Sequence, residues 1–148
     1  MRLFFFFPVL SILFFGCPSD DDVAPIDPAP DPICGDLIQL VSDLPDAADI
    51  PQGVEASVDG LCLSITVGFS GCTDELATME LYTTGDIAES LPTQSSAAFV
   101  FNDSNPGEDQ ACLAFFTRTF EFDLTPYLAE SLPSILRIDG TDIEILVE

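Results

Sequence analysis

The feature that most constrains this chain is a strict alternation of apolar and polar residues. Apolar side chains occupy every second position over residues 54–58 and again over residues 61–69. Successive side chains of a strand point to opposite faces, so each run predicts a strand with one apolar face. Between the runs lies Asp59-Gly60, a dipeptide favoured in two-residue hairpin turns. The sequence therefore predicts a hairpin with three apolar pairs: Val58 with Leu61, Ala56 with Leu63 and Val54 with Ile65.

A second Asp-Gly pair, Asp139-Gly140, predicts a hairpin near the C-terminus, between residues 136–138 and 143–147. In this hairpin we expect Arg137 to face Asp142, an opposite-charge pair worth a few tenths of a kcal/mol. Alternation elsewhere predicts three more strands, over residues 78–83, 97–101 and 111–124. The last of these is long enough to require a bend or a bulge.

Two segments carry helical signals. Thr125-Pro126 is typical of an N-cap followed by proline at the first helical position, and Pro133 would end that turn. Residues 36–44 fit either one face of a helix or a strand. Short strands separated by Gly, Pro and Asp turns favour a single immunoglobulin-like antiparallel β-sandwich with one or two short helical turns over residues 33–148. We find no internal repeat and no composition break within that range.

The N-terminus carries a basic residue, Arg2, and then an apolar run from Leu3 to Phe15. This run is shorter than the roughly 20 apolar residues that a membrane-spanning helix needs, which favours a signal peptide over residues 1–16. Gly16-Cys17 and the two residues before it resemble a lipobox. We expect Cys17 to be diacylated and to attach the mature chain stably to a membrane. The alternative is an ordinary secretory signal, although no A-x-A-like cleavage site is present.

Residues 17–32 are acidic and rich in proline, a composition that predicts an extended tether. The acidic residues 20–22 resemble the export signal of Bacteroidetes surface lipoproteins. We therefore expect a protein anchored by lipid in the outer membrane and displayed on the cell surface, with the periplasmic face as the alternative. A solvated linker without a sorting role is the simpler interpretation of the same residues.

Four cysteines remain beyond the one assigned to lipid, and disulfides are the usual state of cysteines in an exported chain. Three connectivities are possible. We favour Cys72 with Cys112, because both lie at the ends of predicted strands, which leaves Cys34 to pair with Cys62. A redox or zinc site is a weaker interpretation, because the chain has neither a C-x-x-C motif nor a histidine.

Three short segments, together with the lipobox, resemble a group of uncharacterised Bacteroidetes lipoproteins with a small all-β domain. They are Ser70-Gly71-Cys72, residues 109–114 and Phe122-Asp123-Leu124. The resemblance implies the fold and the location, but no reaction. Members of the group often carry a histidine after the first cysteine and another before the second. This chain has no histidine, so the resemblance does not extend to a metal site.

The absence of histidine and lysine excludes several kinds of catalysis. A Ser-His-Asp or Cys-His relay, a Ser-Lys dyad and a Schiff-base lysine all require one of these residues. A pair of carboxylates acting as acid and base or nucleophile, as in glycosidases, remains possible. With 26 acidic residues, some pair falls at a suitable distance by chance. We therefore expect that the chain is not an enzyme and keep a carboxylate hydrolase as the alternative.

Removing the signal leaves two arginines against 26 acidic residues, a formal charge of 2 − 26 = −24. Such a charge excludes nucleic acid and anionic lipid as partners. A solvated acidic surface is the simplest explanation. A calcium site is an alternative, because Asp103, Asn105 and Asp109 place oxygen ligands around a glycine, although a plain connection between strands fits the same residues. We expect no other cofactor.

Together these features predict a lipid-anchored, exported, non-catalytic module that binds a protein or a glycan at the cell surface. We expect an exposed patch near Tyr82 or Phe101 to carry that binding. A structural envelope lipoprotein is one alternative. A carboxylate hydrolase is the other, and it requires two acidic side chains about 5 to 10 Å apart in one cleft.

Overall fold

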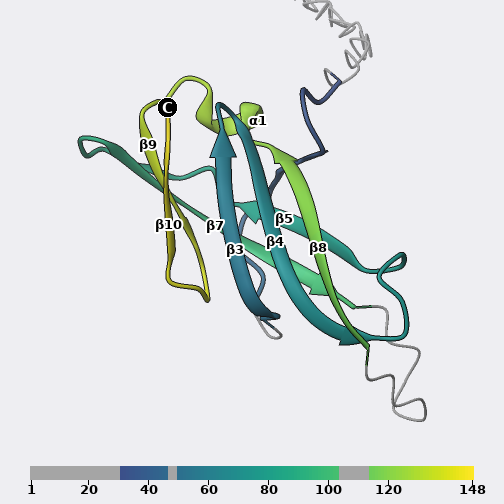
Figure 1. Ribbon diagram of the computed structural model, residues 1–148. Coiled ribbons are helices and arrows are strands. Elements are labelled where there is room, and N and C mark those ends of the chain that lie inside the picture. Colours follow the sequence, from purple (N-terminus) through teal and green to yellow (C-terminus); the bar gives the residue numbers. More distant parts are fainter. Residues whose placement is uncertain (1–30, 47–49, 104–113) are drawn as a thin grey trace, which may run out of the picture. The chain divides into compact units, whose positions relative to one another are not determined.

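The computed structural model describes residues 31–46, 50–103 and 114–148, which form two β-sheets packed face to face (Figure 1). The first sheet is the one in front in Figure 1, and its four strands follow the order β1-β8-β4-β3. Their bounds are Asp36–Leu37 for β1, Ala114–Asp123 for β8, Cys62–Gly71 for β4 and Gln52–Asp59 for β3.

The second sheet has the order β10-β9-β7-β5-β2, and β6 also pairs with β7. The strand bounds are Ile143–Val147 for β10, Ser134–Ile138 for β9, Thr93–Asn102 for β7, Thr78–Thr83 for β5, Gln39–Leu40 for β2 and Ile87–Ala88 for β6. One helix, α1 (Thr125–Leu128), follows β8. The predicted all-β sandwich is thus confirmed, but three strand pairs are parallel: β1 with β8, β2 with β5 and β7 with β9. The finer immunoglobulin-like assignment stays a prediction.

The ambiguous segment 36–44 forms two very short strands rather than a helix. β1 joins the first sheet and β2 joins the second, with Ile38 between them. Ile38 is only 3% exposed, because the chain passes from one sheet to the other at this residue and places its side chain in the core. Each sheet thereby gains a short parallel strand at one edge.

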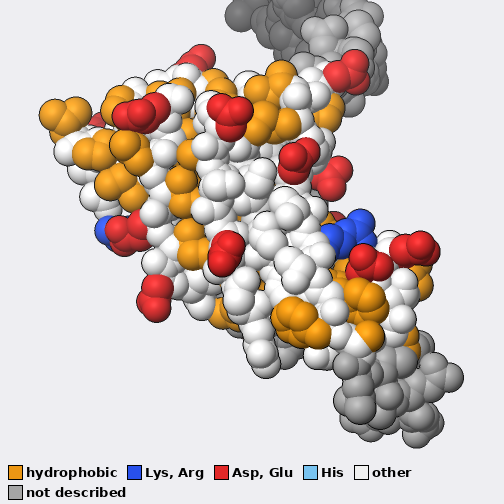
Figure 2. All heavy atoms as spheres, viewed as in Figure 1, with side chains coloured by type: hydrophobic (Ala, Val, Ile, Leu, Met, Phe, Trp, Pro, Cys, Tyr) orange, Lys and Arg blue, Asp and Glu red, His pale blue; other side chains and the backbone are white. Residues whose placement is uncertain are grey.

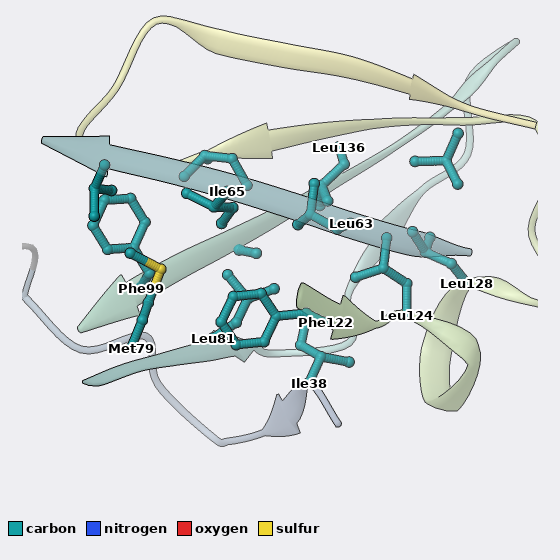
Figure 3. Packing of buried hydrophobic residues seen from close by; sticks show 14 of the residues in the cluster. Ile38, Leu63, Ile65, Met79, Leu81, Phe99, Phe122, Leu124, Leu128 and Leu136 are labelled. Carbon is teal, nitrogen blue, oxygen red and sulfur yellow. The ribbon is translucent and has the colours of Figure 1, made fainter. Parts of the chain in front are cut away.

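The core lies between the sheets and is built from the inward residues of the long strands (Figure 3). Leu63 and Ile65 of β4 and Phe122 of β8 face Leu81 of β5 and Leu136 of β9, and all five are fully buried. Burial of one such side chain contributes roughly 1.5–3 kcal/mol relative to exposure. The alternation that predicts the strands also selects these core residues.

The first hairpin forms, but its predicted register is wrong. Asp59 pairs with Cys62 and Val58 with Leu63, so the two-residue turn is Gly60-Leu61. Gly60 has φ +59° and takes the first central position, where the turns of two-residue hairpins require positive φ. The observed and predicted registers both keep every apolar residue on one face. Alternation therefore fixes the face of the strand but does not choose between them.

The C-terminal hairpin also forms, with a longer turn than predicted. Ile138 pairs with Ile143, so residues 139–142 make the turn. Arg137 consequently faces Glu144 rather than Asp142, and the Arg137 Nε and Glu144 Oε1 atoms lie 2.9 Å apart. The Thr141 hydroxyl shapes this turn, donating to the Ile138 carbonyl at 2.8 Å and accepting from the Ile143 N–H at 3.1 Å.

The helix begins one residue earlier than predicted, at Thr125 rather than at Pro126. Leu124 is the N-cap of α1, and Thr125 is its first helical residue. The carboxylate of Asp123 accepts the Thr125 N–H at 2.8 Å and so supplies the acceptor that the sequence pattern assigns to Thr125. Strand β5 matches the predicted range 78–83, and β7 contains the predicted range 97–101. β8 covers residues 114–123 of the predicted 111–124, and residues 111–113 lie outside the described residues.

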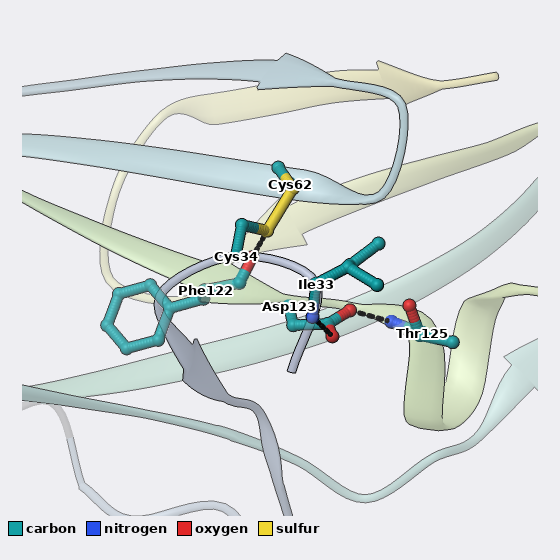
Figure 4. Close-up of a disulfide and its surroundings, with 6 residues drawn as sticks. All are labelled: Ile33, Cys34, Cys62, Phe122, Asp123 and Thr125. Carbon is teal, nitrogen blue, oxygen red and sulfur yellow. Dashed lines mark hydrogen bonds between the residues drawn. A yellow bond between two sulfur atoms is a disulfide. The ribbon is translucent and has the colours of Figure 1, made fainter. Parts of the chain in front are cut away.

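The structure confirms the disulfide between Cys34 and Cys62, whose Cα atoms are 6.0 Å apart (Figure 4). It joins the segment before β1 to the first residue of β4. Cys72 is also disulfide-bonded. Cys112, its predicted partner, lies outside the described residues, so that pairing stays a prediction.

The parallel neighbours β7 and β9 reveal a short sequence duplication, so the expectation of no internal repeat is wrong. Residues 84–93 (TGDIAESLPT) and 125–134 (TPYLAESLPS) share the segment Ala-Glu-Ser-Leu-Pro. Each copy leads into one of the two strands, and the strands pair at the same offset, residue 93 with 134 and 94 with 135. Leu91, in the first copy, is 97% exposed.

Candidate functional site

A cleft of about 860 Å³ opens between the start of β3 and the end of β7. Both sheets contribute to it, because β4 and β8 supply residues from the first sheet and β7 supplies residues from the second. The described lining residues are Ile50, Pro51, Gln52, Gly68, Phe69, Ser70, Val100, Phe101, Asn102, Asp103 and Phe115.

The cleft lies where strand β7 extends beyond the β9–β10 hairpin that pairs with it. β9 pairs with residues 93–97 of β7, and the Asp139 N–H then donates to the Ala97 carbonyl at 2.8 Å. β7 continues for five more residues, to Asn102. Neither β9 nor β10 continues beside residues 98–102, so within the described residues the second sheet is two strands narrower there and the sandwich is open.

Aromatic rings line the inner wall of the cleft. Phe69 and Phe101 meet edge to face, with ring centroids 5.1 Å apart, and Phe101 contacts Phe120 at 6.2 Å. Phe69 also lies 5.9 Å from Phe116. Such pairs contribute about 0.5–1.5 kcal/mol beyond their buried area, so this wall is held in place before any ligand arrives.

Phe115 forms the outer lip of the cleft and is 65% exposed. It lies on the outer face of the first sheet, because its neighbour Phe116 points into the sandwich. The ring of Phe115 lies over Gly68, where an added Cβ would be 2.6 Å from Phe115 Cζ. Gly68 thus makes room for an aromatic ring that is only partly covered by the protein.

The outer face of the first sheet differs from its margins in charge. Figure 2 shows mostly uncharged side chains and backbone over β4 and β8, with acidic side chains toward the edges. Two threonines connect the strands here, since the Thr66 and Thr119 hydroxyls are hydrogen-bonded at 2.8 Å. Phe115 is the large exposed apolar side chain on this part of β8.

Of the two residues expected to mark a binding patch, Phe101 belongs to the cleft and Tyr82 does not. Tyr82 lies on β5, and its hydroxyl donates to Glu80 Oε2 at 2.8 Å. This hydrogen bond, together with partial burial and the nearby charge of Glu80, raises the pKa of Tyr82 above its usual value. Tyr82 is thus engaged with Glu80 and lies away from the cleft.

The predicted calcium ligands are only partly described. Asp103 lines the cleft, whereas Asn105 and Asp109 lie outside the described residues, as does Cys17. Within residues 31–46, 50–103 and 114–148 no group of three or more His, Cys, Asp or Glu side chains is placed to hold a metal ion. The calcium site stays a prediction.

Comparison with protein-family models, with curated proteins and with solved structures finds no match to this chain. No helix among the described residues is long and apolar enough to cross a membrane. The cleft itself could not be found from the sequence, since it depends on where β9 ends beside β7. The sequence gives one weak indication of the site: Phe115 and Phe116 are successive residues of a predicted strand, so one of the two rings must point away from the core.

Proposed function

We propose that this protein is an exported, lipid-anchored binding module, attached to the outer membrane at Cys17, whose ligand enters the cleft between β3 and β7. The supporting observation is the cleft itself. It is lined by Phe69, Phe101 and Phe115, and its volume lies within the range of ordinary ligand sites. An exposed aromatic residue beside a preformed apolar wall is typical of binding sites.

The alternatives receive less support from the same cleft. A carboxylate hydrolase needs two acidic side chains that face one substrate, and the described lining has one, Asp103. A structural envelope lipoprotein has no need of an open cleft with an exposed ring. The formal charge of −24 favours a partner that carries positive or neutral groups over one that is anionic.

The binding role is tested by screening the full chain against glycan and peptide arrays, alongside two variants. Phe115→Ala removes the exposed ring from the cleft. Leu76→Ala is the matched control, because Leu76 is also exposed but does not line the cleft. We expect a ligand whose binding weakens at least about tenfold in Phe115→Ala and stays unchanged in Leu76→Ala. Ligands insensitive to Phe115→Ala would place binding elsewhere.

The cell-surface location and the lipid anchor are tested separately, by proteolysis of intact cells that express the full chain. We expect digestion of the wild-type domain at the cell surface and release of the Cys17→Ala variant from the membrane. Protection of the wild type until the cells are lysed would indicate the periplasmic face. Membrane attachment that persists in Cys17→Ala would refute the lipid anchor.

A further inference from the structure

Among the described residues, no strand lies beside one flank of β7 where it borders the cleft. β9 pairs with residues 93–97, and β5 pairs with residues 98–102 on the opposite flank. Beyond Ala97, no residue in the described ranges pairs with β7 on the side that β9 occupies. We call the strand position beside residues 98–102, in line with β9, the open lane.

Backbone groups of β7 point into this lane. Successive residues of a strand direct their N–H and C=O groups to opposite sides. Ala97 uses its carbonyl on the β9 side, so Phe99 and Phe101 direct theirs to the same side. Phe99 is 4% exposed, whereas Phe101 lines the cleft. The N–H and C=O of Phe101 are therefore the groups that an incoming strand would meet.

The open lane lacks the protection that two other free edges have. Natural sheet edges are guarded by inward-pointing charges, bulges or prolines, which prevent further strands from pairing. β8 carries Arg118 on its core face, opposite buried Val67, and the guanidinium lies 5.0 Å from the ring centroid of Phe120. It also donates to the carbonyl of Asp74.

The edge strand β3 is guarded in a different way. Its pairing with β4 is interrupted by a register shift between Gln52 and Glu55, and Pro51 precedes it. Residues 98–102 of β7 read Ala-Phe-Val-Phe-Asn, with no charge, proline or glycine. An apolar strand flank of this kind is suited to pairing with another strand.

We propose that the open lane receives an extended segment of a partner protein, which adds a strand to the second sheet in line with β9. This inference rests on the proposed function, because it names the class of ligand that the cleft would hold. Ala98 and Phe99 are buried, so the accessible part of this flank, residues 100–102, offers about 10 Å of strand at 3.4 Å per residue. Alternate side chains of the segment would face the sandwich, beside the rings of Phe69 and Phe101.

Charge selects the kind of segment. Asp103 lines the cleft, and Glu80 lies on the outer face of β5 beside β7. The inward residues of the segment should be apolar, to match the aromatic rings of the cleft. Its outward residues should be Lys or Arg, to match the carboxylates of Asp103 and Glu80. A second copy of this chain would bring a further formal charge of −24, so self-association through the lane is opposed by repulsion.

The test uses the full chain and a synthetic peptide, Lys-Val-Lys-Val-Lys-Val-Lys. Two derivatives are N-methylated either at every valine amide or at every lysine amide. In a strand these two sets of amides point to opposite sides, so only one set can pair with β7. We expect methylation of one set to weaken binding at least about tenfold and methylation of the other to change it little.

Amide hydrogen exchange provides a second readout that needs no variant. We expect the Phe101 amide to exchange rapidly in the free protein and at least about tenfold more slowly with the peptide bound. The Val100 amide is the internal control, because Val100 is already paired with Glu80 of β5 and should change little. Slow exchange of Phe101 in the free protein would show that the chain itself fills the lane, which would overturn the inference.

The remaining outcomes separate the inference from the proposed function. Peptide binding that needs Phe115 but tolerates both methylations would refute strand addition and leave the binding role intact. Binding of glycans alone, again dependent on Phe115, would have the same meaning. If no peptide or glycan binds in a manner that depends on Phe115, both proposals fail.

Discussion

At the scale of single residues, Asp123 holds together three parts of the fold. Its side chain is buried, with Oδ2 accepting the Ile33 N–H at 2.9 Å and Oδ1 accepting the Thr125 N–H at 2.8 Å (Figure 4). Burial by itself would raise the pKa of this carboxyl, but the hydrogen bonds from Thr125 and Ile33 outweigh burial and lower it. The carboxylate therefore fastens the N-terminal segment and the start of α1 to the end of β8.

We predict that Asp123→Asn lowers the free energy of unfolding at pH 7 by about 2 kcal/mol, because the neutral amide has one oxygen and can accept only one of the two N–H groups that the carboxylate accepts. Urea denaturation measures this loss. A lowered pKa in the folded state gives stability that is present above the unfolded value of about 3.9 and disappears as the pH falls through the folded value. The two proteins should therefore converge in stability at low pH, and a constant difference would contradict the role of the charge.

Gly35 is the position where an added methyl group would be least tolerated. It has φ +47°, and a Cβ placed on it would lie 1.9 Å from the carbonyl oxygen of Glu121, which belongs to the backbone of β8. We predict that Gly35→Ala lowers the free energy of unfolding by more than about 3 kcal/mol, measured by urea denaturation.

Gly60→Ala is the matched control for this prediction. Gly60 also has positive φ, at +59°, but nothing lies within 4 Å of the point that an added Cβ would occupy. The substitution should cost only about 1–2 kcal/mol, which is the expense of the backbone conformation. Equal losses in the two variants would show that the close approach to Glu121 does not affect the free energy of unfolding.

At the scale of elements, the Cys34–Cys62 disulfide ties the short N-terminal strands to β4. The two cysteines are 28 residues apart, and a closed loop of that length restricts the unfolded chain by about 3 to 4 kcal/mol. We predict a loss of that size in the double variant Cys34→Ser/Cys62→Ser, measured by urea denaturation. Hydrogen exchange should show β1 and β2 opening first. A double variant with wild-type stability would mean that β1 and β2 are held by packing alone.

The elements also show how far the sequence determines this fold. Alternation and Asp-Gly turns identify both hairpins and the face of each strand, because a side-chain period of two is a local property. They do not identify the register, since moving the turn from Asp59-Gly60 to Gly60-Leu61 leaves all apolar residues on the same face. The longer turn after Ile138 is another local choice, made by the Thr141 hydroxyl.

The cleft lies beyond such local signals. Phe101 could be singled out as a residue near a binding patch, but its place in the cleft depends on β9 ending beside Ala97. The parallel pairing of β7 with β9 is a tertiary feature, although the same segment, Ala-Glu-Ser-Leu-Pro, precedes both strands. A search for short exact repeats finds this segment but does not predict the pairing.

At the scale of the whole molecule, charge is the dominant property. Nearly all of the described acidic side chains are exposed or half-buried, with Asp123 as the buried exception. They face two arginines, Arg118 and Arg137, and the ion pair of Arg137 with Glu144 compensates only a small part of this charge. Figure 2 shows the acidic side chains dispersed over one face rather than gathered at one point. Folding therefore brings many like charges together.

Salt should stabilise this protein, because it screens repulsion between exposed carboxylates. The Debye length falls from about 30 Å at 0.01 M to about 3 Å at 1 M ionic strength. Relief of about 1 kcal/mol of repulsion raises the melting temperature of a domain of this size by roughly 4 °C, and we predict an increase of at least that size in NaCl. Calorimetry at pH 7 measures this increase in melting temperature.

Replacing part of the NaCl with CaCl₂ at equal ionic strength is the control, since a further increase would reveal specific calcium binding near Asp103. A melting temperature independent of NaCl would mean that the acidic side chains are too far apart in the folded state to repel one another appreciably.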